Sequence, residues 1–516
     1  MATRSRAMLA GMLAGPAALA VAGVLVNGLN LFMNLVLARV LDPAQYGAVV
    51  VQVSIFMILS VFGNALLIAV VQRETSGDGD SRRAQWAWIR RLRGACGLGV
   101  VAASAVAVLL CRPAAALLSY AHPLAVAEAV VGAAVWTLLC VERGVLQARG
   151  AYSRLAVNFV VEAALRIGLI VVFVGAGLGV NGAGLGLVLG IALGAEHARL
   201  GVAKVPRPAR AAVPPAAATV PGGAPLAVRE QALGLDGATD MPVAGPGPLT
   251  ATGPLLIPGP TRSGRGGLLA DTWVALGALV PLALLQNMDV VIVGWLDHDG
   301  AGAYAAISTA CKVPVFIGLA VANFLLPEAA RRRAAGHGTA PALAVAVAFV
   351  VTPGLLLAGL GTVAARPLLS MVFGPDLAGA ASSLSVLALG MTCLAVTMMF
   401  TTYLLGAAQR RVVAVLTACA VVTAAGLGLA GGDAMRTSVA GLVCHATTAL
   451  ALGILVHLLH RADARAAAAR AAAAPPAGVV PTAAGPGGRV VPGGEAGTVR
   501  PGQPPPGGEA RPVGVW

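Results

Sequence analysis

The residues in this sequence that could bind or move a charged group are polar side chains placed inside long apolar stretches. Asn158, Glu162 and Arg166 follow one another at intervals of four residues, which places all three on one face of a helix. Glu162 and Arg166 can form an ion pair at this spacing. The face is either a structural contact with a neighbouring helix or a cavity wall that binds a charged headgroup, and the spacing leaves both interpretations open.

A second set of polar residues lies further along the chain. Asn287 and Asp289 lie in one apolar stretch, and Ser308, Lys312 and Asn323 share a face of the next. Polar groups at membrane depth are costly unless they are paired or hydrated, so they mark helix contacts or cavities. We expect Asp289 and Lys312 either to neutralise each other as a structural pair or to serve in gating or substrate binding.

Amides and a single carboxylate complete the set. Asn27, Asn30 and Asn34 lie near one face of the first apolar stretch. Amides commonly join membrane helices, which is the preferred interpretation, and they also suit hydroxyl-rich sugars because they both donate and accept hydrogen bonds. Glu128 has no partner in its own stretch, so it predicts either proton coupling or, more simply, a position near the outer interface.

No arrangement of residues typical of a soluble catalytic site is present. The seven cysteines form no CxxC or Cys/His metal spacing, so we interpret them as small apolar residues. There is no Walker motif, and the glycines at 182, 184 and 186 lie in an apolar stretch, which favours helix packing over nucleotide binding. The sequence therefore predicts a protein that is not an enzyme and holds no metal or cofactor.

The composition indicates a membrane protein. Hydrophobic residues make up 58% of the 516 residues and charged residues 11%, whereas soluble domains carry about 25% charge. Too few charged residues remain to cover a surface in water, and a bilayer tolerates apolar side chains that face outward. The net charge of +14 is spread over short connecting segments, so it does not predict nucleic-acid binding.

Twelve stretches are long and apolar enough to cross a bilayer, which takes about 20 residues. They are approximately 14–38, 46–71, 94–118, 123–147, 153–175, 179–200, 268–296, 302–327, 340–365, 380–406, 411–430 and 437–459. The Pro/Gly/Ala-rich break between the sixth and seventh predicts a flexible linker. We therefore predict an N-terminal group of six helices in 1–203, a linker in 204–265, a C-terminal group of six in 266–461 and a disordered tail in 462–516.

The basic residues predict the orientation of the chain. With an even number of spans, 29 of the 35 Lys and Arg residues fall in segments on the side that holds both termini; Arg143 is counted in one of these segments. Four fall on the other side (Arg39, Arg112, Arg366 and Arg436), and Arg166 and Lys312 lie inside spans. Cytoplasmic segments carry the excess of basic residues. We therefore expect a multi-pass protein of the cytoplasmic membrane with both termini in the cytoplasm.

The two groups of six share a local pattern. Residues 37–47 (LARVLDPAQYG) end the first span, and residues 293–305 end the seventh; both run from an apolar helix through Leu-Asp and a short turn to Gly and Tyr. Such a match at equivalent places indicates a parallel internal repeat. Residues 37–47 resemble the signature that follows the first helix of polysaccharide exporters. Residues 286–294 (QNMDVVIVG), 302–306 (GAYAA) and 324–331 (FLLPEAAR) are similar to the seventh and eighth helices of that family.

This family is the O-antigen flippase branch of the multidrug/oligosaccharidyl-lipid/polysaccharide (MOP) superfamily. The resemblance implies an all-α integral membrane fold, MATE-like, with two six-helix bundles around a central cavity that opens to each side in turn. It implies a flippase for a lipid-linked oligosaccharide or polysaccharide precursor, with membrane lipids and glycan polymerases or glycosyltransferases as partners.

The resemblance also directs attention to the polar residues inside the spans. The cavity candidates are Arg166 and Lys312, which would balance a pyrophosphate, with Glu162, Asp289, Asn30, Asn34, Asn158 and Asn287. The alternatives are a cation-coupled multidrug or metabolite antiporter of the same superfamily, with Asp289 or Glu162 as its cation site, and a membrane glycan polymerase or a scaffold.

Overall fold

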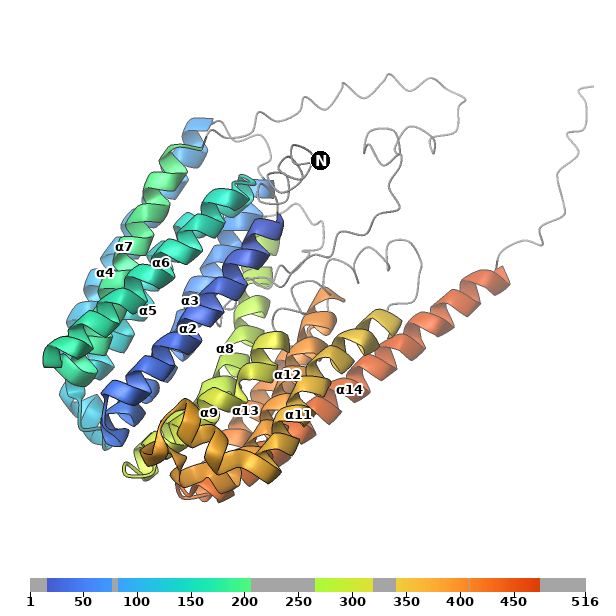
Figure 1. Ribbon diagram of the computed structural model, residues 1–516. Coiled ribbons are helices and arrows are strands. Elements are labelled where there is room, and N and C mark those ends of the chain that lie inside the picture. The colour runs from blue at the N-terminus through green and yellow to red at the C-terminus, as the bar shows by residue number, and fades with distance from the viewer. Residues whose placement is uncertain (1–15, 77–81, 206–264, 319–339, 408, 474–516) are drawn as a thin grey trace, which may run out of the picture. The chain divides into compact units, whose positions relative to one another are not determined.

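The structure is a computed structural model that describes residues 16–76, 82–205, 265–318, 340–407 and 409–473 (Figure 1). The chain divides into two units, residues 1–461 and 462–516. Most of the predicted linker, the predicted tail beyond Ala473, Asn323 and residues 324–331 lie outside the described residues. The predicted four-part division of the chain therefore stays a prediction.

The described residues form helices and contain no strand. The helices of the first half are α2 (Pro16–Val40), α3 (Pro43–Ser76), α4 (Arg82–Leu117), α5 (Pro123–Ala148), α6 (Tyr152–Phe173), a π-helical turn (Val174–Leu178) and α7 (Gly179–Ala203). Those of the second half are α8 (Arg265–Leu296), α9 (Ala301–Cys311), α11 (Ala340–Val372), a 3-10 segment (Pro375–Ser383), α12 (Leu384–Gly406), α13 (Arg411–Leu429) and α14 (Ala434–Ala473).

Several of these helices begin where local chemistry favours a start. α3 and α5 begin with a proline, whose fixed φ suits the first helical position and whose missing N–H would have no partner there. α4 begins at Arg82, well before the predicted edge at residue 94. The apolar window of the sequence analysis excluded the arginines at 90, 91 and 93, but these residues favour a helix as much as most apolar ones do.

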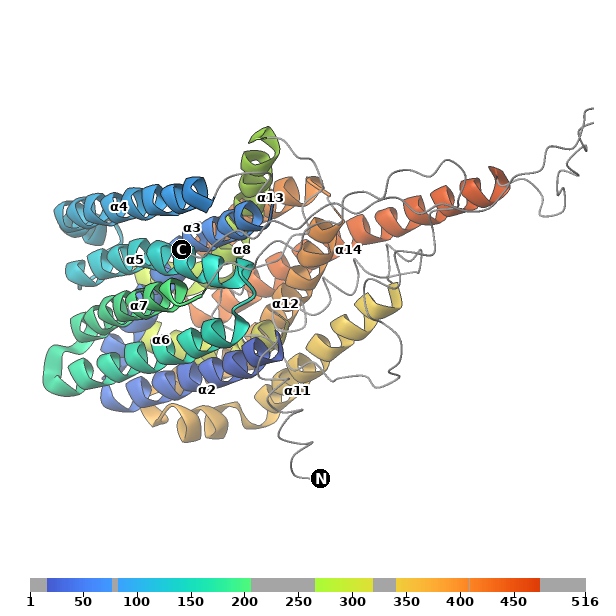
Figure 2. The same cartoon turned by 90° about the horizontal axis from the view of Figure 1, so that it is seen from above.

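Eleven helical stretches in the described residues are long and apolar enough to cross a membrane. One of the eleven, Tyr152–Ala203, has 52 residues; as one straight helix it would be about 78 Å long, against a hydrocarbon core of about 30 Å. It is bent back on itself at Gly177 (φ 88°) and Gly179 (φ 54°), a backbone conformation that glycine adopts readily. α6 and α7 lie side by side as a result (Figures 1 and 2), so the eleven stretches contain twelve helical spans. Of the eighth predicted span, 302–327, the structure describes residues 302–318.

Each half has its own set of packed neighbours. In the first half α3 packs on α5, α5 on α4 and α7, α7 on α6, and α6 on α2. In the second half α11 packs on α12, and α8 on α13. α3 also packs on α8 and α9, which makes it the main link between the halves.

The repeated pattern forms the same turn in both halves. The Asp42 carboxylate accepts a hydrogen bond from the backbone N–H of Gln45 at 2.8 Å, and the Asp297 carboxylate accepts one from Gly300 at 3.0 Å. The tyrosines that follow, Tyr46 and Tyr304, are fully buried. The two turns also meet in space, because a Cβ atom added at Gly47 would lie 2.7 Å from the backbone nitrogen of Gly302.

Candidate functional site

The polar face predicted on α6 is buried in the interior of the first half. Asn158 and Glu162 are fully buried, and Arg166 is 7% exposed. Arg166 Nε donates a hydrogen bond to Glu162 Oε1 at 2.8 Å, the predicted pair along the helix. The 3.6-residue period of the helix brings these side chains to one face, as the spacing predicts.

α5 adds a residue to this face that the sequence analysis placed elsewhere. Arg143, counted among the basic connecting segments, lies inside α5 and is 1% exposed. Its Nη2 lies 3.4 Å from Glu162 Oε2, and its Nε donates to Asn158 Oδ1 at 2.8 Å. Its guanidinium also lies over the rings of Phe159 (4.2 Å) and Trp136 (5.2 Å). The signal for this position was the predicted span 123–147, which already contains Arg143 although the charge count placed this residue in a connecting segment.

α2 completes the first cluster through one of its asparagines. Arg166 Nη2 donates to Asn30 Oδ1 at 3.1 Å, so Asn30 joins α2 to α6 as the preferred interpretation expected. Asn34 instead donates to the backbone oxygen of Asn30 at 2.9 Å, and Asn27 donates to that of Gly23 at 2.6 Å. Of the three amides, Asn30 alone contacts another helix through a hydrogen bond among the described residues.

The first cluster carries one more positive charge than negative. Glu162 gives one oxygen to Arg143 and the other to Arg166, and within the described part of the chain neither arginine has a second carboxylate. Arg143 Nη1 is buried and has no hydrogen-bond partner there. A buried ion pair repays the cost of desolvation only when every charge is matched, so a net positive charge at membrane depth favours the approach of an anion.

The close packing of α7 on α6 fixes this cluster in place. Gly186, Gly190 and Gly194 lie on one face of α7, and a Cβ at Gly190 would overlap the backbone of Arg166. A Cβ at Gly194 would lie 2.5 Å from Glu162 Cγ. The glycine-rich stretch therefore serves packing, as the sequence analysis expected, and it lets α7 press against the backbone of the residues that carry the charges.

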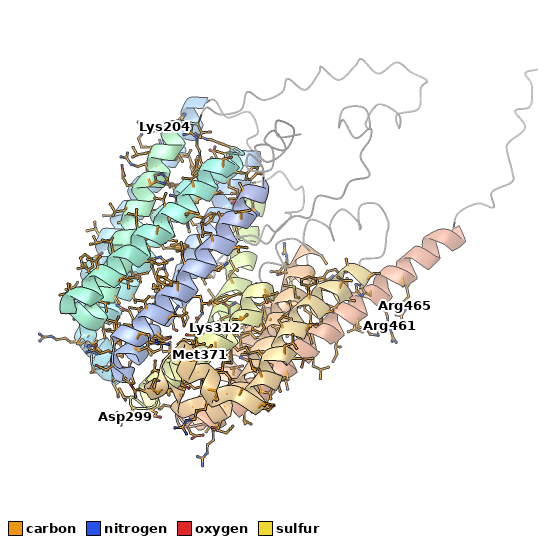
Figure 3. All side chains as sticks on the ribbon, viewed as in Figure 1. Lys204, Asp299, Lys312, Met371, Arg461 and Arg465 are labelled. Atoms are coloured by element: carbon orange, nitrogen blue, oxygen red, sulfur yellow. The ribbon has the colours of Figure 1, made fainter. Side chains whose placement is uncertain are left out.

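Polar residues of α8 and of the end of α9 form a second cluster. Its contacts differ from the predicted pair of Asp289 and Lys312. Lys312 Nζ donates to Asn287 Oδ1 at 3.1 Å, and it forms no ion pair with Asp289. Asp289 Oδ2 instead accepts hydrogen bonds from Tyr304 (3.2 Å) and Ser308 (3.1 Å) of α9. Lys312 follows the last residue of α9, where the helix turns, so its side chain reaches α8 at a different level from Ser308 and Tyr304. Figure 3 labels Lys312 among the helices.

This second cluster leaves a buried carboxylate oxygen unmatched. Asp289 is 4% exposed, and its Oδ1 has no hydrogen-bond partner among the residues that the structure describes. Nor does any hydrogen bond or ion pair in that part of the chain link the second cluster to the first. The structure therefore brings the predicted site residues together in two groups: Arg166, Glu162, Asn158 and Asn30 in one, and Lys312, Asn287 and Asp289 in the other, with Asn34 beside the first.

Glu128 has a partner that its own stretch did not reveal. Gln52 of α3 donates a hydrogen bond from Nε2 to Glu128 Oε2 at 2.9 Å, and a second one to the backbone oxygen of Ala125 at 3.1 Å. A Cβ at Gly184 would occupy the place of the Glu128 carboxylate. The site is thus built to hold this carboxylate, which forms no ion pair with a described residue.

A separate apolar cavity lies between α8 and α13. Its volume is about 390 Å³, and its walls include Leu276, Pro281, Met288 and Val421. Thr417 also lines it, but the hydroxyl of Thr417 already donates to the backbone oxygen of Val413 at 2.9 Å. None of the predicted site residues lines this cavity. In the described residues, no group of three or more His, Cys, Asp or Glu side chains could hold a metal ion.

Comparisons with known proteins identify the fold. No protein-family model and no curated protein matches the sequence. Solved structures do match: the lipid II flippase MurJ in an inward closed conformation has a TM-score of 0.60 at 11% identity, over 85% of this chain and 87% of that one. An inward-facing multidrug resistance MATE family transporter of the MOP superfamily has a TM-score of 0.55 at 13% identity, over 85% and 95%.

A third structure, a MOP superfamily transporter from Pyrococcus furiosus, has a TM-score of 0.55 at 13% identity over 88% of this chain and 98% of that one. The chain therefore has the predicted fold, an all-α, MATE-like integral membrane fold. At these identities the similarity establishes the fold and leaves the substrate to the chemistry of the site.

Proposed function

We propose that this protein is a flippase that moves a lipid-linked oligosaccharide or polysaccharide precursor across the cytoplasmic membrane by alternating access. The observation that carries the proposal is the unmatched positive charge of the first cluster, where Arg143 and Arg166 share Glu162. The membrane-embedded group that such a site suits is an anion, and guanidinium groups bind phosphate oxygens with paired hydrogen bonds.

The second cluster supports the same kind of substrate. Lys312 is matched by an amide rather than by a carboxylate, so its positive charge is also available to an anion. Asn30 and Asn287 place amide groups beside the two cations, and amides can bind sugar hydroxyls. The MATE-like fold supports alternating access, and one protein of this fold, MurJ, is described as a lipid II flippase.

The proposal includes the orientation and the partners expected from the sequence. Both termini lie in the cytoplasm, the lipid-linked glycan arrives from the inner leaflet, and the enzymes that make or polymerise the glycan are the partners. No covalent step is required of this chain, since translocation needs binding and a conformational change alone.

The direct test is depletion of the protein in cells that make the glycan. The lipid-linked intermediate should accumulate in the inner leaflet, and the glycan exposed on the outer leaflet should fall. Arg166→Gln and Lys312→Gln should each lower complementation about tenfold, because each removes a charged hydrogen bond to the substrate. Normal outer-leaflet glycan after depletion would disprove the flippase. Full activity of both variants would exclude Arg166 and Lys312 as ligands of the substrate.

One observation favours a second function, a cation-coupled antiporter. The buried Asp289 carboxylate has an oxygen without a partner in the described residues, and such an oxygen could take a cation or a proton. Under this alternative Asp289→Asn would raise drug sensitivity in cells and abolish cation-driven uptake in vesicles, with glycan export unchanged. Loss of glycan export with unchanged drug sensitivity would rule the antiporter out.

A further inference from the structure

Five helix ends of the first half meet at a basic surface that the proposed function does not use. We call the C-terminal ends of α3, α5 and α7 and the N-terminal ends of α4 and α6 the basic end. Arg149, which directly follows α5, has its Nε 3.8 Å from Glu74 Oε2 of α3. Its Nη1 donates to the backbone oxygen of Val205, just after α7, at 3.2 Å. Lys204 marks this end in Figure 3, and Asp299 of the α8–α9 turn lies at the opposite end of the bundle.

Every described carboxylate of the basic end is already paired. Glu74 pairs with Arg149, Glu196 pairs with Arg199, and Glu142 forms two hydrogen bonds of 2.6 Å with Arg93. Exposed cations remain that form no ion pair with a described residue; these are Arg90, Arg91, Arg154 and Lys204. At the basic end, exposed cations are therefore available to an anionic partner, whereas every described carboxylate is already in an ion pair.

Arg90 and Arg91 lie at the edge of an exposed apolar face of α4, which in a membrane-spanning helix suits contact with lipid. α4 packs on α5 through Ile89, Ala107 and Cys111, while its opposite side carries exposed apolar residues such as Leu98 (71%) and Leu109 (77%). Arg90 begins this exposed side and Arg112 ends it. Arg90 and Arg112 are 22 positions apart, a rise of about 33 Å, close to the thickness of the hydrocarbon core of about 30 Å. We therefore place Arg90 and Arg91 at the depth of the lipid headgroups.

An aromatic side chain lies close to these arginines. Trp86 is 42% exposed, and its ring is held in place by the Arg149 guanidinium, which lies 4.9 Å from the ring centroid. Tryptophan concentrates at the interface between bilayer and water, where it has one apolar and one polar side. Trp86 thus lies one turn of helix before Arg90 and can report on the lipids that gather there.

We propose that the basic end of this protein binds anionic phospholipid headgroups through Arg90 and Arg91 and selects them over zwitterionic lipids. The guanidinium groups supply paired donors to phosphate oxygens, and the exposed side of α4 seats the acyl chains. A free acidic protein would not need the apolar side of α4 or the placement at headgroup depth, so lipid is the partner that fits. This proposal is independent of what the protein transports.

The test uses Trp86 as a reporter in the full-length protein reconstituted in phosphatidylcholine vesicles. A minor fraction of the lipid is brominated, either as phosphatidylglycerol or as phosphatidylcholine, because bromine quenches tryptophan fluorescence on contact. The difference between the protein and its Trp86→Phe variant isolates the signal of Trp86. Phosphatidylglycerol should quench Trp86 at a mole fraction about tenfold lower than phosphatidylcholine does, and added salt should reduce this preference.

The double variant Arg90→Gln/Arg91→Gln should lose the preference, and the matched variant Arg112→Gln should keep it because it lies at the other end of the same face. Thermal unfolding of the variants checks that they are folded. Equal quenching of the unaltered protein by the two lipids would overturn the proposal. So would a preference that survives in the folded double variant, or one that Arg112→Gln removes.

Discussion

The position of single charges within the first half decides what its interior can bind. Glu162 lies between two arginines and divides its two oxygens between them. If Arg143 were an apolar residue, Glu162 and Arg166 would form a neutral pair within one helix. A purely structural role would then explain the polar face of α6. The arginine from α5 makes the cluster cationic, which is the property that an anionic substrate needs.

The first prediction tests this charge count. Arg143→Met should leave a neutral pair of Glu162 and Arg166 and lower transport about tenfold or more, because the anion loses its electrostatic attraction. The double variant Arg143→Met/Glu162→Gln restores the single positive charge and should recover much of the activity. Transport is measured relative to the amount of folded protein in the membrane.

Arg199→Gln is the matched control, since it removes an exposed arginine that pairs with an exposed glutamate at the end of α7. It should transport normally. A folded double variant as inactive as Arg143→Met alone would show that Arg143 is needed for its own contacts with Trp136 and Phe159 rather than for the charge count.

The helix pair α6–α7 shows how a whole element holds a site in place. Gly190 presses on the backbone of Arg166 and Gly194 on the side chain of Glu162. Small residues at such intervals let two membrane helices approach closely, so van der Waals contact replaces the hydrophobic effect that is absent between helices in lipid. The packing of α7 against α6 therefore fixes the position of the charged residues of α6.

The second prediction concerns this contact. Gly190→Ala should destabilise the protein by about 1–3 kcal/mol, because the added Cβ overlaps backbone atoms of Arg166 that cannot move independently. Gly168→Ala is the matched control, as Gly168 lies in α6 with nothing within 4 Å of an added Cβ. It should be neutral or slightly stabilising, since alanine favours a helix more than glycine does. Thermal unfolding in detergent would measure both variants, and equal stability would contradict the packing role.

The contact between the two repeated turns is the clearest feature at the scale of the whole first unit. Gly47 and Gly302 occupy equivalent places in the two halves and meet backbone to backbone, so that a Cβ at Gly302 would overlap the carbonyl group of Pro43. Two further bonds join the halves near this end: Arg39 Nη2 donates to the backbone oxygen of Met371 at 2.5 Å, and the His298 ring is bonded to the backbone oxygen of Ser119. Alternating access by the two halves would require this end to open.

The third prediction tests whether this end opens and closes. Gly302→Leu should prevent the close contact and shift the population toward states in which the two turns separate, because a side chain cannot fit against Pro43. Spin labels placed at the exposed positions Leu117 and Asp299, in a chain without its native cysteines, should then report a longer distance. Gly428→Leu, on an exposed position of α13, is the control and should leave the distance unchanged. An unchanged distance in a folded Gly302→Leu variant would contradict the opening of the molecule at the two turns.

Local patterns in the sequence were sufficient for an all-α membrane protein, for the number of spans and for the repeated turn, and the resemblance to polysaccharide exporters supplied the MATE-like arrangement. The reason is that a bilayer imposes one rule on every span, an apolar helix of about 20 residues, and each span can be recognised without its neighbours. The face of Asn158, Glu162 and Arg166 also follows from sequence alone, because the period of one helix fixes it.

The partners of these residues on other helices could not be predicted in this way. The sequence analysis counted Arg143 with the connecting segments and offered a pair of Asp289 and Lys312 as one interpretation. The structure brings Arg143 to Glu162, Lys312 to Asn287 and Asp289 to Tyr304. Which side chains meet across helices depends on the rotation, depth and spacing at which the helices pack. Sequence therefore determined that polar groups lie inside the membrane and on which helix face, and only the tertiary structure decided which charges are matched and which are left for a ligand.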